Sequence, residues 1–420
     1  MSTESVFTYG APQLKFGTGS SDELGFDLAQ LGARRVLVLT DPGVSATGAP
    51  QRIAEQMRRY DIDALVWDGV HVEPTDESLL AAVEHARSTG PWDAYVAVGG
   101  GSTIDTAKAV NLLTTNPGEL MDYVNAPVGM GLAPSQPLKP LIAVPTTTGT
   151  GSESTTICVL DVLHLKVKTG ISHARLRPTL AVVDPALTFT QPAGVTAASG
   201  MDILCHALES WTARWYTSGD RKAPEQRVPY CGANPISDMW ADRAMSLLAG
   251  SFRTAVRDGA DEQARSNMAL AATFAGMGFG NAGVHIPHAN AYPIAGQAHD
   301  FHPEGYPTAL VPHGMSVSLT APEAFRFTFD ASPERHVRAA ALLDPDARAD
   351  DPRDLLPTVL TDLMRDIGIP NGIGAVGFED DDVPSLVEGA LKQQRLLATC
   401  PREVTGEDLA GIFERSVELW

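Results

Sequence analysis

The segment Tyr95-Val96-Ala97-Val98-Gly99-Gly100-Gly101-Ser102 decides the fold class of this 420-residue chain. Four residues typical of a buried strand lead directly into three glycines, and residues 103–113 behind them have the composition of a helix. Glycines let a backbone approach a pyrophosphate closely, and the N–H groups at a helix start carry partial positive charge. The turn therefore favours a dinucleotide-binding site, with an ordinary loop as the alternative.

Strand and helix patterns alternate on both sides of this segment. We expect further strands at residues 36–40, 64–67, 141–144 and 180–183, and helices at residues 50–60 and 77–88. Strands that alternate with helices indicate a parallel sheet covered on both faces. Residues 1–190 are therefore predicted to form an α/β dinucleotide-binding domain.

The strand patterns end at Gln191-Pro192, and helical stretches follow at residues 196–214, 235–257, 262–279, 353–367, 382–396 and 406–418. Residues 191–420 are therefore predicted to form an all-α domain. Two long polar segments, 215–235 and 296–313, are expected to be loops, and loops of that length inside a compact domain tend to be functional.

Polar residues at the ends of the predicted strands supply cofactor candidates. Asp41 closes the first strand, where a carboxylate accepts from ribose hydroxyls and repels a 2′-phosphate, which favours NAD over NADP. A plain turn aspartate before Pro42 is the equal alternative. A second glycine-rich loop follows strand 141–144. The full candidate set is Asp41, Gly99, Gly100, Gly101, Ser102, Asp105, Thr146, Thr147, Thr150 and Ser152.

A possible metal site begins in the segment Gly200–Glu209. On a helix, Asp202 and His206 stand at i and i+4, on one face, so that both can grip one divalent cation. Two ligands are too few, and the segment 285–313 offers five of the eleven histidines: His285, His288, His299, His302 and His313. Such a nitrogen and oxygen donor set suits Fe(II) or Zn(II). The plainer interpretation is a polar pair on a helix and histidines in a surface loop.

Composition excludes some functions. A net charge of −20 repels phosphates, so neither nucleic acid nor an anionic membrane surface is an expected partner. We see neither a secretory signal nor an apolar run of the roughly 18 residues that span a membrane. Four scattered cysteines fit reduced thiols. We therefore expect a cytoplasmic protein.

Taken together, these motifs resemble the iron-containing (group III) alcohol dehydrogenase family over essentially the whole length. The motifs that carry the resemblance are Gly99–Ser102 with Asp105 and Lys108, Pro145–Glu153, Arg177-Pro178 with Asp184-Pro185, Gly200-Met201-Asp202 with His206 and Glu209, His288, and Pro312-His313-Gly314. The resemblance implies four metal ligands, Asp202, His206, His288 and His313. It also implies Fe²⁺, with Zn²⁺ possible, and a homodimer or higher homo-oligomer.

The chain departs from that family at its second histidine motif, which here is His288-Ala289-Asn290-Ala291-Tyr292-Pro293. Tyr292 replaces a non-ligand histidine often assigned to proton relay, and His285 is a second candidate for that role. A substrate carboxylate needs a nearby cation, for which Lys168, Arg177 and Arg227 are candidates. The catalytic candidates are therefore His285, Tyr292 and Lys168.

Within that family the chain resembles hydroxyacid–oxoacid transhydrogenases, through Pro229-Tyr230, Asn234–Asp238 and residues 284–294 and 310–314. This resemblance implies hydride transfer between an alcohol or hydroxyacid and an aldehyde or ketone, with 4-hydroxybutyrate and 2-oxoglutarate as a possible pair. Three alternatives stay open: an NAD- and metal-dependent lyase of the dehydroquinate synthase type, a metal-free reductase of the maleylacetate type, and a metal-bearing protein without catalysis.

Overall fold

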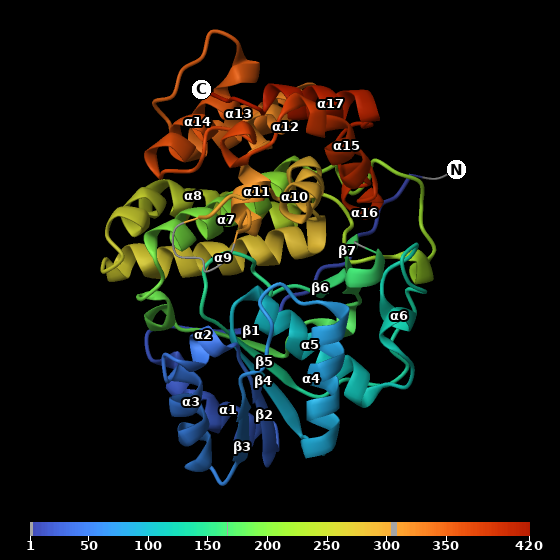
Figure 1. Ribbon diagram of the computed structural model, residues 1–420, viewed down its shortest axis with the longest axis vertical. Coiled ribbons are helices and arrows are strands. Elements are labelled where there is room, and N and C mark those ends of the chain that lie inside the picture. Colours follow the sequence, from blue (N-terminus) through green and yellow to red (C-terminus); the bar gives the residue numbers. More distant parts are fainter. Residues whose placement is uncertain (1–2, 166, 304–308) are drawn as a thin grey trace. The chain divides into compact units, whose positions relative to one another are not determined.

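The computed structural model describes residues 3–165, 167–303 and 309–420, which divide into two compact units (Figure 1). Gly10–Phe189 form an α/β unit. The chain from Thr190 onward, together with the N-terminal segment that ends at Tyr9, forms a helical unit. The predicted division at residue 190 placed that segment in the first domain. It packs with the helical unit because Glu4 accepts hydrogen bonds from Arg227 (Nη1 to Oε2, 2.9 Å).

The α/β unit is built on a six-stranded sheet whose pairs are all parallel, in the order β1-β8-β5-β4-β2-β3. This confirms the predicted parallel sheet. Its strands are β1 Gln13–Phe16, β2 Arg35–Leu39, β3 Asp63–Trp67, β4 Ala94–Gly99, β5 Leu141–Pro145 and β8 Leu180–Val183. A separate antiparallel hairpin, β6 Ile157–Val162 and β7 Val167–Ser172, was not expected from the sequence.

Helices cover both faces of this sheet, because its strands bury side chains on both sides. Val36 and Val38 of β2 face one core, which α1 and α3 complete, while Leu37 and Leu39 face the other, completed by α4 and α5. In Figure 1 the blue α1 and α3 stand on one side of the strands and α4 and α5 on the other. The helices are α1 Leu24–Gln30, α2 Pro42–Ser45, α3 Ala49–Arg58, α4 Asp76–Thr89, α5 Gly101–Thr115 and α6 Leu120–Tyr123.

The helical unit contains no β-strand within its described residues, as predicted. Its helices are α7 Ala193–Thr212, α8 Pro235–Arg257, α9 Glu262–Ala282, α10 Ile286–Gly296, α11 His313–Ser318, α12 Ala321–Thr328, α13 Pro333–Leu343, α14 Pro352–Asp366, α15 Val383–Leu391, α16 Gln394–Leu397 and α17 Gly406–Arg415. Helices α10 to α13 were not expected from the sequence. Among the parts of the chain that the structure describes, no helix combines the length and hydropathy needed to cross a bilayer.

Helix α7 lies at the centre of this unit, and almost all of its residues from Thr196 to Thr212 are buried. A helix that is buried on every side needs neighbours all round, and α8, α9 and α11 supply them. Glycines permit the closest approaches. A Cβ on Gly200 would lie 2.2 Å from Cε2 of Phe252, and one on Gly314 of α11 would lie 2.1 Å from the carbonyl oxygen of Ala198.

The contact at Gly314 predicts a large effect of one added methyl group. Gly314→Ala should lower the free energy of unfolding by about 1–3 kcal/mol, because the clash is with backbone that cannot rotate away. Gly250→Ala on α8 is the matched control, since an added Cβ there meets nothing within 4 Å. It should be neutral or stabilising by up to ~1 kcal/mol.

Urea titrations followed by circular dichroism measure both effects. Equal urea midpoints for Gly314→Ala and the unmodified chain would contradict the packing described here.

Candidate functional site

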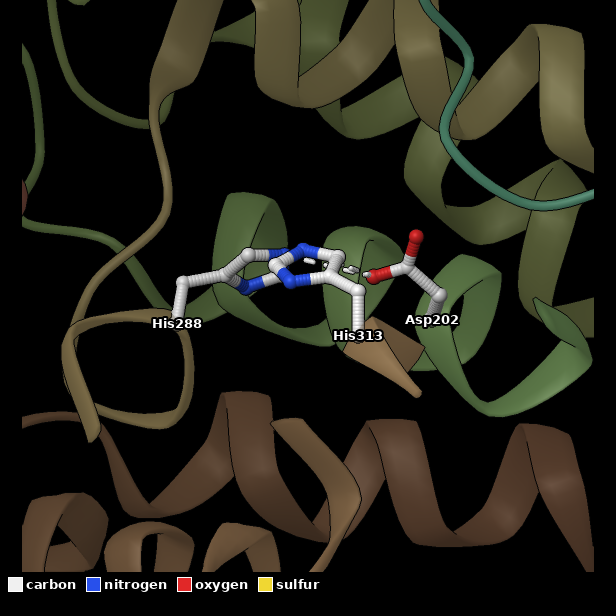
Figure 2. A group of neighbouring side chains, drawn as sticks. All are labelled: Asp202, His288 and His313. Carbon is white, nitrogen blue, oxygen red and sulfur yellow. Dashed lines mark ion pairs between the residues drawn. The ribbon is translucent and has the colours of Figure 1, made fainter. Parts of the chain in front are cut away.

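Three histidines of the helical unit gather around one carboxylate oxygen. From Oδ1 of Asp202 on α7, Nε2 of His288 on α10 lies 3.4 Å away and Nε2 of His313 on α11 lies 3.8 Å away (Figure 2). Nδ1 of His206, one turn further along α7, lies 3.7 Å from the same oxygen. The predicted i and i+4 pair is thus joined by two histidines of the predicted histidine-rich segment.

This cluster fits a divalent metal. Oδ1 of Asp202, Nδ1 of His206 and Nε2 of His288 are buried and have no hydrogen-bond partner among the described residues. Buried polar atoms are normally paired, so three neighbouring exceptions need an explanation. Ligand atoms that surround a tetrahedral metal at about 2.1 Å stand roughly 3.4 Å apart. The ring nitrogens of His206, His288 and His313 lie 3.4–3.8 Å from Oδ1 of Asp202, close to that spacing, and the ligand atoms of Asp202, His288 and His313 all lie within 4.8 Å of one another.

The surroundings of His206 keep its ring neutral and fixed in orientation, so that a ring nitrogen can donate a lone pair to a metal. Burial lowers the pKa of His206 to about 3, so the imidazole is neutral at physiological pH. Its ring stacks on Phe279, with ring centroids 3.8 Å apart, and on His288 at 4.4 Å. These contacts hold the ring in one orientation.

Glu209 is a functional residue that the sequence interpretation did not assign to the site. Its side chain is fully buried, and Oε1 accepts from the backbone N–H groups of His285 (2.7 Å) and His288 (3.2 Å). Oε2 contacts Nδ1 of His288. A carboxylate at one ring nitrogen sets the tautomer and directs the other nitrogen toward a metal. The signal was available, because Glu209 follows Asp202 by seven positions and shares its helix face.

The same contact changes the basicity of His288. Burial lowers the pKa of His288, but the carboxylates of Glu209 and Asp202 outweigh burial and raise it to about 9. A metal that binds His288 must therefore displace a proton from the ring.

The three predicted catalytic residues have different surroundings. His285 is fully buried, its Nε2 lies 2.9 Å from Oγ1 of Thr212, and its ring meets the ring of Phe325. Tyr292 lies one turn after His288, with its ring centroid 6.4 Å from that of His313. Lys168 belongs to the α/β unit, where it pairs with Glu73 and Asp161.

The other basic candidates are also engaged. Arg227 forms a two-pronged pair with Glu4, and Nε of Arg177 donates to the carbonyl oxygen of Ser154 (3.1 Å). In the histidine-rich segment, His299 lies 3.5 Å from Asp382 and His302 lies 3.6 Å from Asp300. His299 and His302 are thus placed outside the cluster around Asp202.

The glycine turn lies at the carboxyl edge of the sheet, where β4 ends and α5 begins. A Cβ on Gly100 would lie 3.2 Å from Oγ1 of Thr147, and one on Gly101 would lie 2.7 Å from Thr150. The loop after β5 therefore packs directly on the turn. Nearby, the buried Oγ1 atoms of Thr40 and Thr146, at the ends of β2 and β5, have no hydrogen-bond partner in the described part of the chain. Hydroxyls without a partner, beside the N-terminus of a helix, are suited to donate hydrogen bonds to a nucleotide phosphate.

Asp105 and Ser152, two of the predicted cofactor residues, instead take part in a buried network around Lys108. Nζ of Lys108 is fully buried and donates to Asp105 (3.2 Å), Oγ of Ser152 (2.7 Å) and the carbonyl oxygen of Ile157 (2.6 Å). Ser152 also donates to Asp105. An amino group with this many partners can stay charged while buried. The network holds the loop after β5 against α5.

Asp41 and Ser102 also have local partners. Oδ1 of Asp41 accepts from the backbone N–H of Val44 (3.0 Å), which makes it the N-cap of α2, and Oδ2 accepts from Thr103 (3.3 Å). Oγ of Ser102 accepts from the backbone N–H of Glu73 (3.1 Å). Asp41 thus caps the helix that begins at Pro42, while its half-buried carboxylate remains a candidate for ribose.

Comparisons with known proteins agree with this arrangement. The family model described as iron-containing alcohol dehydrogenase matches residues 11–185, and the C-terminal model of the Fe-containing alcohol dehydrogenase family matches residues 223–417. The mitochondrial hydroxyacid-oxoacid transhydrogenase of Rattus norvegicus is 46% identical over 427 residues, covering 100% of this chain and 91% of the relative.

Solved structures show the same fold. A 1,3-propanediol oxidoreductase is 31% identical, with a TM-score of 0.85 over 98% of this chain and 100% of that one. Sulfoacetaldehyde reductase from Bifidobacterium kashiwanohense, solved in complex with NAD+, is 26% identical, with a TM-score of 0.82 over 98% of this chain and 99% of that one.

The curated relatives also correct one expectation. The transhydrogenases of rat, mouse, cattle and human are named as mitochondrial, which contradicts the predicted cytoplasmic location. Reduced cysteines were the ground for that prediction, and they do not distinguish the cytosol from another reducing compartment.

The family models cover both units, and the relatives align over the full chain. The chain therefore belongs to the iron-containing alcohol dehydrogenase family and is an oxidoreductase that carries out metal-dependent, NAD-linked hydride transfer.

Proposed function

We propose that this enzyme is a hydroxyacid–oxoacid transhydrogenase that uses Fe²⁺, with Zn²⁺ as the alternative metal, and NAD. Its hydride donor would be a hydroxyacid such as 4-hydroxybutyrate, and its acceptor an oxoacid such as 2-oxoglutarate. The observation that carries the proposal is the cluster around Oδ1 of Asp202. The chain that contains this cluster is 46% identical, over its full length, to a protein named hydroxyacid-oxoacid transhydrogenase.

In this proposal Asp202, His206, His288 and His313 hold the metal. When bound, the metal supplies Lewis-acid polarisation of the substrate oxygen, and the nicotinamide accepts or donates the hydride. The side chain of His313 is 29% exposed, whereas those of Asp202 and His288 are 5% exposed or less. Substrate therefore approaches the cluster from the side of His313.

The glycine turn and its covering loop would hold the cofactor. The N–H groups at the start of α5 would face the pyrophosphate, and the absent Cβ atoms of Gly99, Gly100 and Gly101 let Thr103, Thr147 and Thr150 pack against the turn. The hydroxyls of Ser102, Thr146, Thr147 and Thr150 and the carboxylate of Asp41 are the further contacts that we propose. Asp105 and Ser152 would act through the position of the loop.

A proton must leave the substrate hydroxyl as hydride departs. Tyr292 is the proposed relay, because its phenol is half-buried on the exposed side of the cluster, near His313. His285 is less suited to this role, since it is fully buried and its ring bonds to Thr212. A relay has to exchange protons with water.

Removal of one ligand should separate metal binding from folding. His288→Ala is expected to lose bound metal and turnover together, while its circular dichroism spectrum stays like that of the parent, because the two backbone N–H groups that donate to Glu209 at the start of α10 remain. Metal content by atomic absorption after anaerobic reconstitution is the direct measurement. Full metal content with retained activity would show that the ligand set is wrong.

The supporting carboxylate predicts a smaller effect. Glu209→Gln should weaken metal affinity by about 10–100-fold, the usual loss when a carboxylate behind a ligating histidine is replaced. Glu334→Gln, at an exposed position of α13, is the matched control and should leave metal affinity unchanged. Competition with a chelator measures both dissociation constants. Equal metal affinities in the two variants would show that Glu209 does not support the metal site.

The proposed reaction has its own assay. Protein reconstituted anaerobically with Fe²⁺ and freed of loose nucleotide should convert 4-hydroxybutyrate and 2-oxoglutarate to 4-oxobutyrate and 2-hydroxyglutarate without added NAD. Parallel arms contain 1,3-propanediol with NAD and 4-hydroxybutyrate with NAD. Turnover only in the arms with added NAD would mean an ordinary dehydrogenase that exchanges its cofactor, and the transhydrogenase proposal would fail.

A further inference from the structure

The helical unit contains a cavity of about 270 Å³ that none of the proposed metal ligands lines. Its walls come from three parts of the chain: the N-terminal segment around Glu4, the loop between α7 and α8, and the end of α16 with the residues that follow it. At about 30 Å³ per water-sized group, this space holds roughly nine such groups. That is the size of a small organic acid.

The cavity is positively charged in a strongly acidic protein. Four cationic side chains line it, Arg214, Lys222, Arg227 and Arg395, against two carboxylates, Glu4 and Asp220. Glu4 and Arg227 bind each other, with two hydrogen bonds of 2.9 and 3.1 Å. Three cations therefore face one carboxylate, while the whole chain carries a net charge of −20.

Arg395 provides a donor that the fold leaves unused. Its Nη1 is buried and has no hydrogen-bond partner among the residues that the structure describes. The guanidinium lies 4.7 Å from the ring centroid of Tyr230, which fixes its plane. Burial raises the pKa of Tyr230 to about 12, so its hydroxyl keeps its proton at neutral pH. A buried donor without an acceptor is costly unless a ligand supplies one.

The hydrogen bonds of Arg214 orient its guanidinium group but do not neutralise its positive charge. Its guanidinium meets the carbonyl oxygens of Ala398 (3.4 Å) and Ser218 (3.5 Å), contacts that are long and uncharged. A planar guanidinium fork suits the two oxygens of a carboxylate. Lys222, which is exposed at the rim, adds a third positive charge.

We propose that this cavity is a binding site for a small oxyanion, a short-chain carboxylic acid, held by Arg395 and Arg214 and attracted by Lys222. The cavity wall continues into the segment that leads to the metal cluster. A Cβ on Gly283 would lie 3.1 Å from the ring of Tyr230 and 2.8 Å from Thr399, and Gly283 stands two positions before His285. The site does not depend on the proposed function, because it requires only that an acid binds.

The test is isothermal titration calorimetry of the intact protein, loaded with metal and NAD, against glutarate. Glutaramide is the uncharged ligand of matched shape, and inorganic phosphate tests the other source of an oxyanion. Glutarate should bind, more weakly as salt is added, and glutaramide should not. Arg395→Gln should raise the dissociation constant for glutarate about tenfold or more, the loss expected for one charge-assisted hydrogen bond.

Arg214→Gln, at an exposed position, should act in the same direction and cannot be dismissed as a folding defect if its circular dichroism is unchanged. Arg243→Gln on α8 is the matched control, since it removes one exposed positive charge outside the cavity and should leave the affinity unchanged. Binding without turnover is measured, so failure of the transhydrogenase assay would leave this result intact.

Three results would overturn the proposal. The first is that neither glutarate nor phosphate binds. The second is that both arginine variants bind glutarate as the parent does while His288→Ala loses it, which would place the acid at the metal cluster. Binding of phosphate alone would show that the cavity does not take carboxylic acids.

Discussion

The arrangement of the helical unit around the site depends on the hydrogen bonds that the buried carboxylate of Glu209 accepts. A charged group without exposed surface is costly unless its oxygens are bonded, and here two backbone N–H groups and an imidazole meet that need. The same bonds satisfy N–H groups at the start of α10, which an isolated helix leaves open. One side chain of α7 thereby fixes where α10 begins and how His288 points. The geometry around Asp202 follows from that link.

The sheet was predictable because buried parallel strands are nearly continuous apolar runs. Residues 95–98 before three glycines are such a run, and β4 and α5 lie where that pattern placed them. Strand β1 was missed, since Gln13–Phe16 is an edge strand with mostly exposed side chains and no such signal. Helix α10 was missed for another reason. Pro287 and Pro293 suggest breaks, yet the first stands in the opening turn, where proline is tolerated.

The candidate site likewise contains some residues that sequence spacing identifies and others that only the fold brings together. The spacing of Asp202 and His206 places both on one helix face, which sequence alone can show. No spacing rule selects His288 and His313 from five histidines, because the packing of α11 against α7 and of α10 against α11 decides which rings come near Asp202. Asp105 shows how a partner distant from the turn changes the surroundings of a predicted residue. It stands beside the glycine turn in sequence, but the buried charge of Lys108 draws its carboxylate inward.

All four proposed metal ligands lie between residues 202 and 313, within one compact unit, whereas the glycine turn belongs to the other. Metal binding, as proposed, therefore draws on side chains of one unit only. Because of the same separation, the proposed ribose contact at Asp41 can be substituted while every proposed metal ligand stays unchanged.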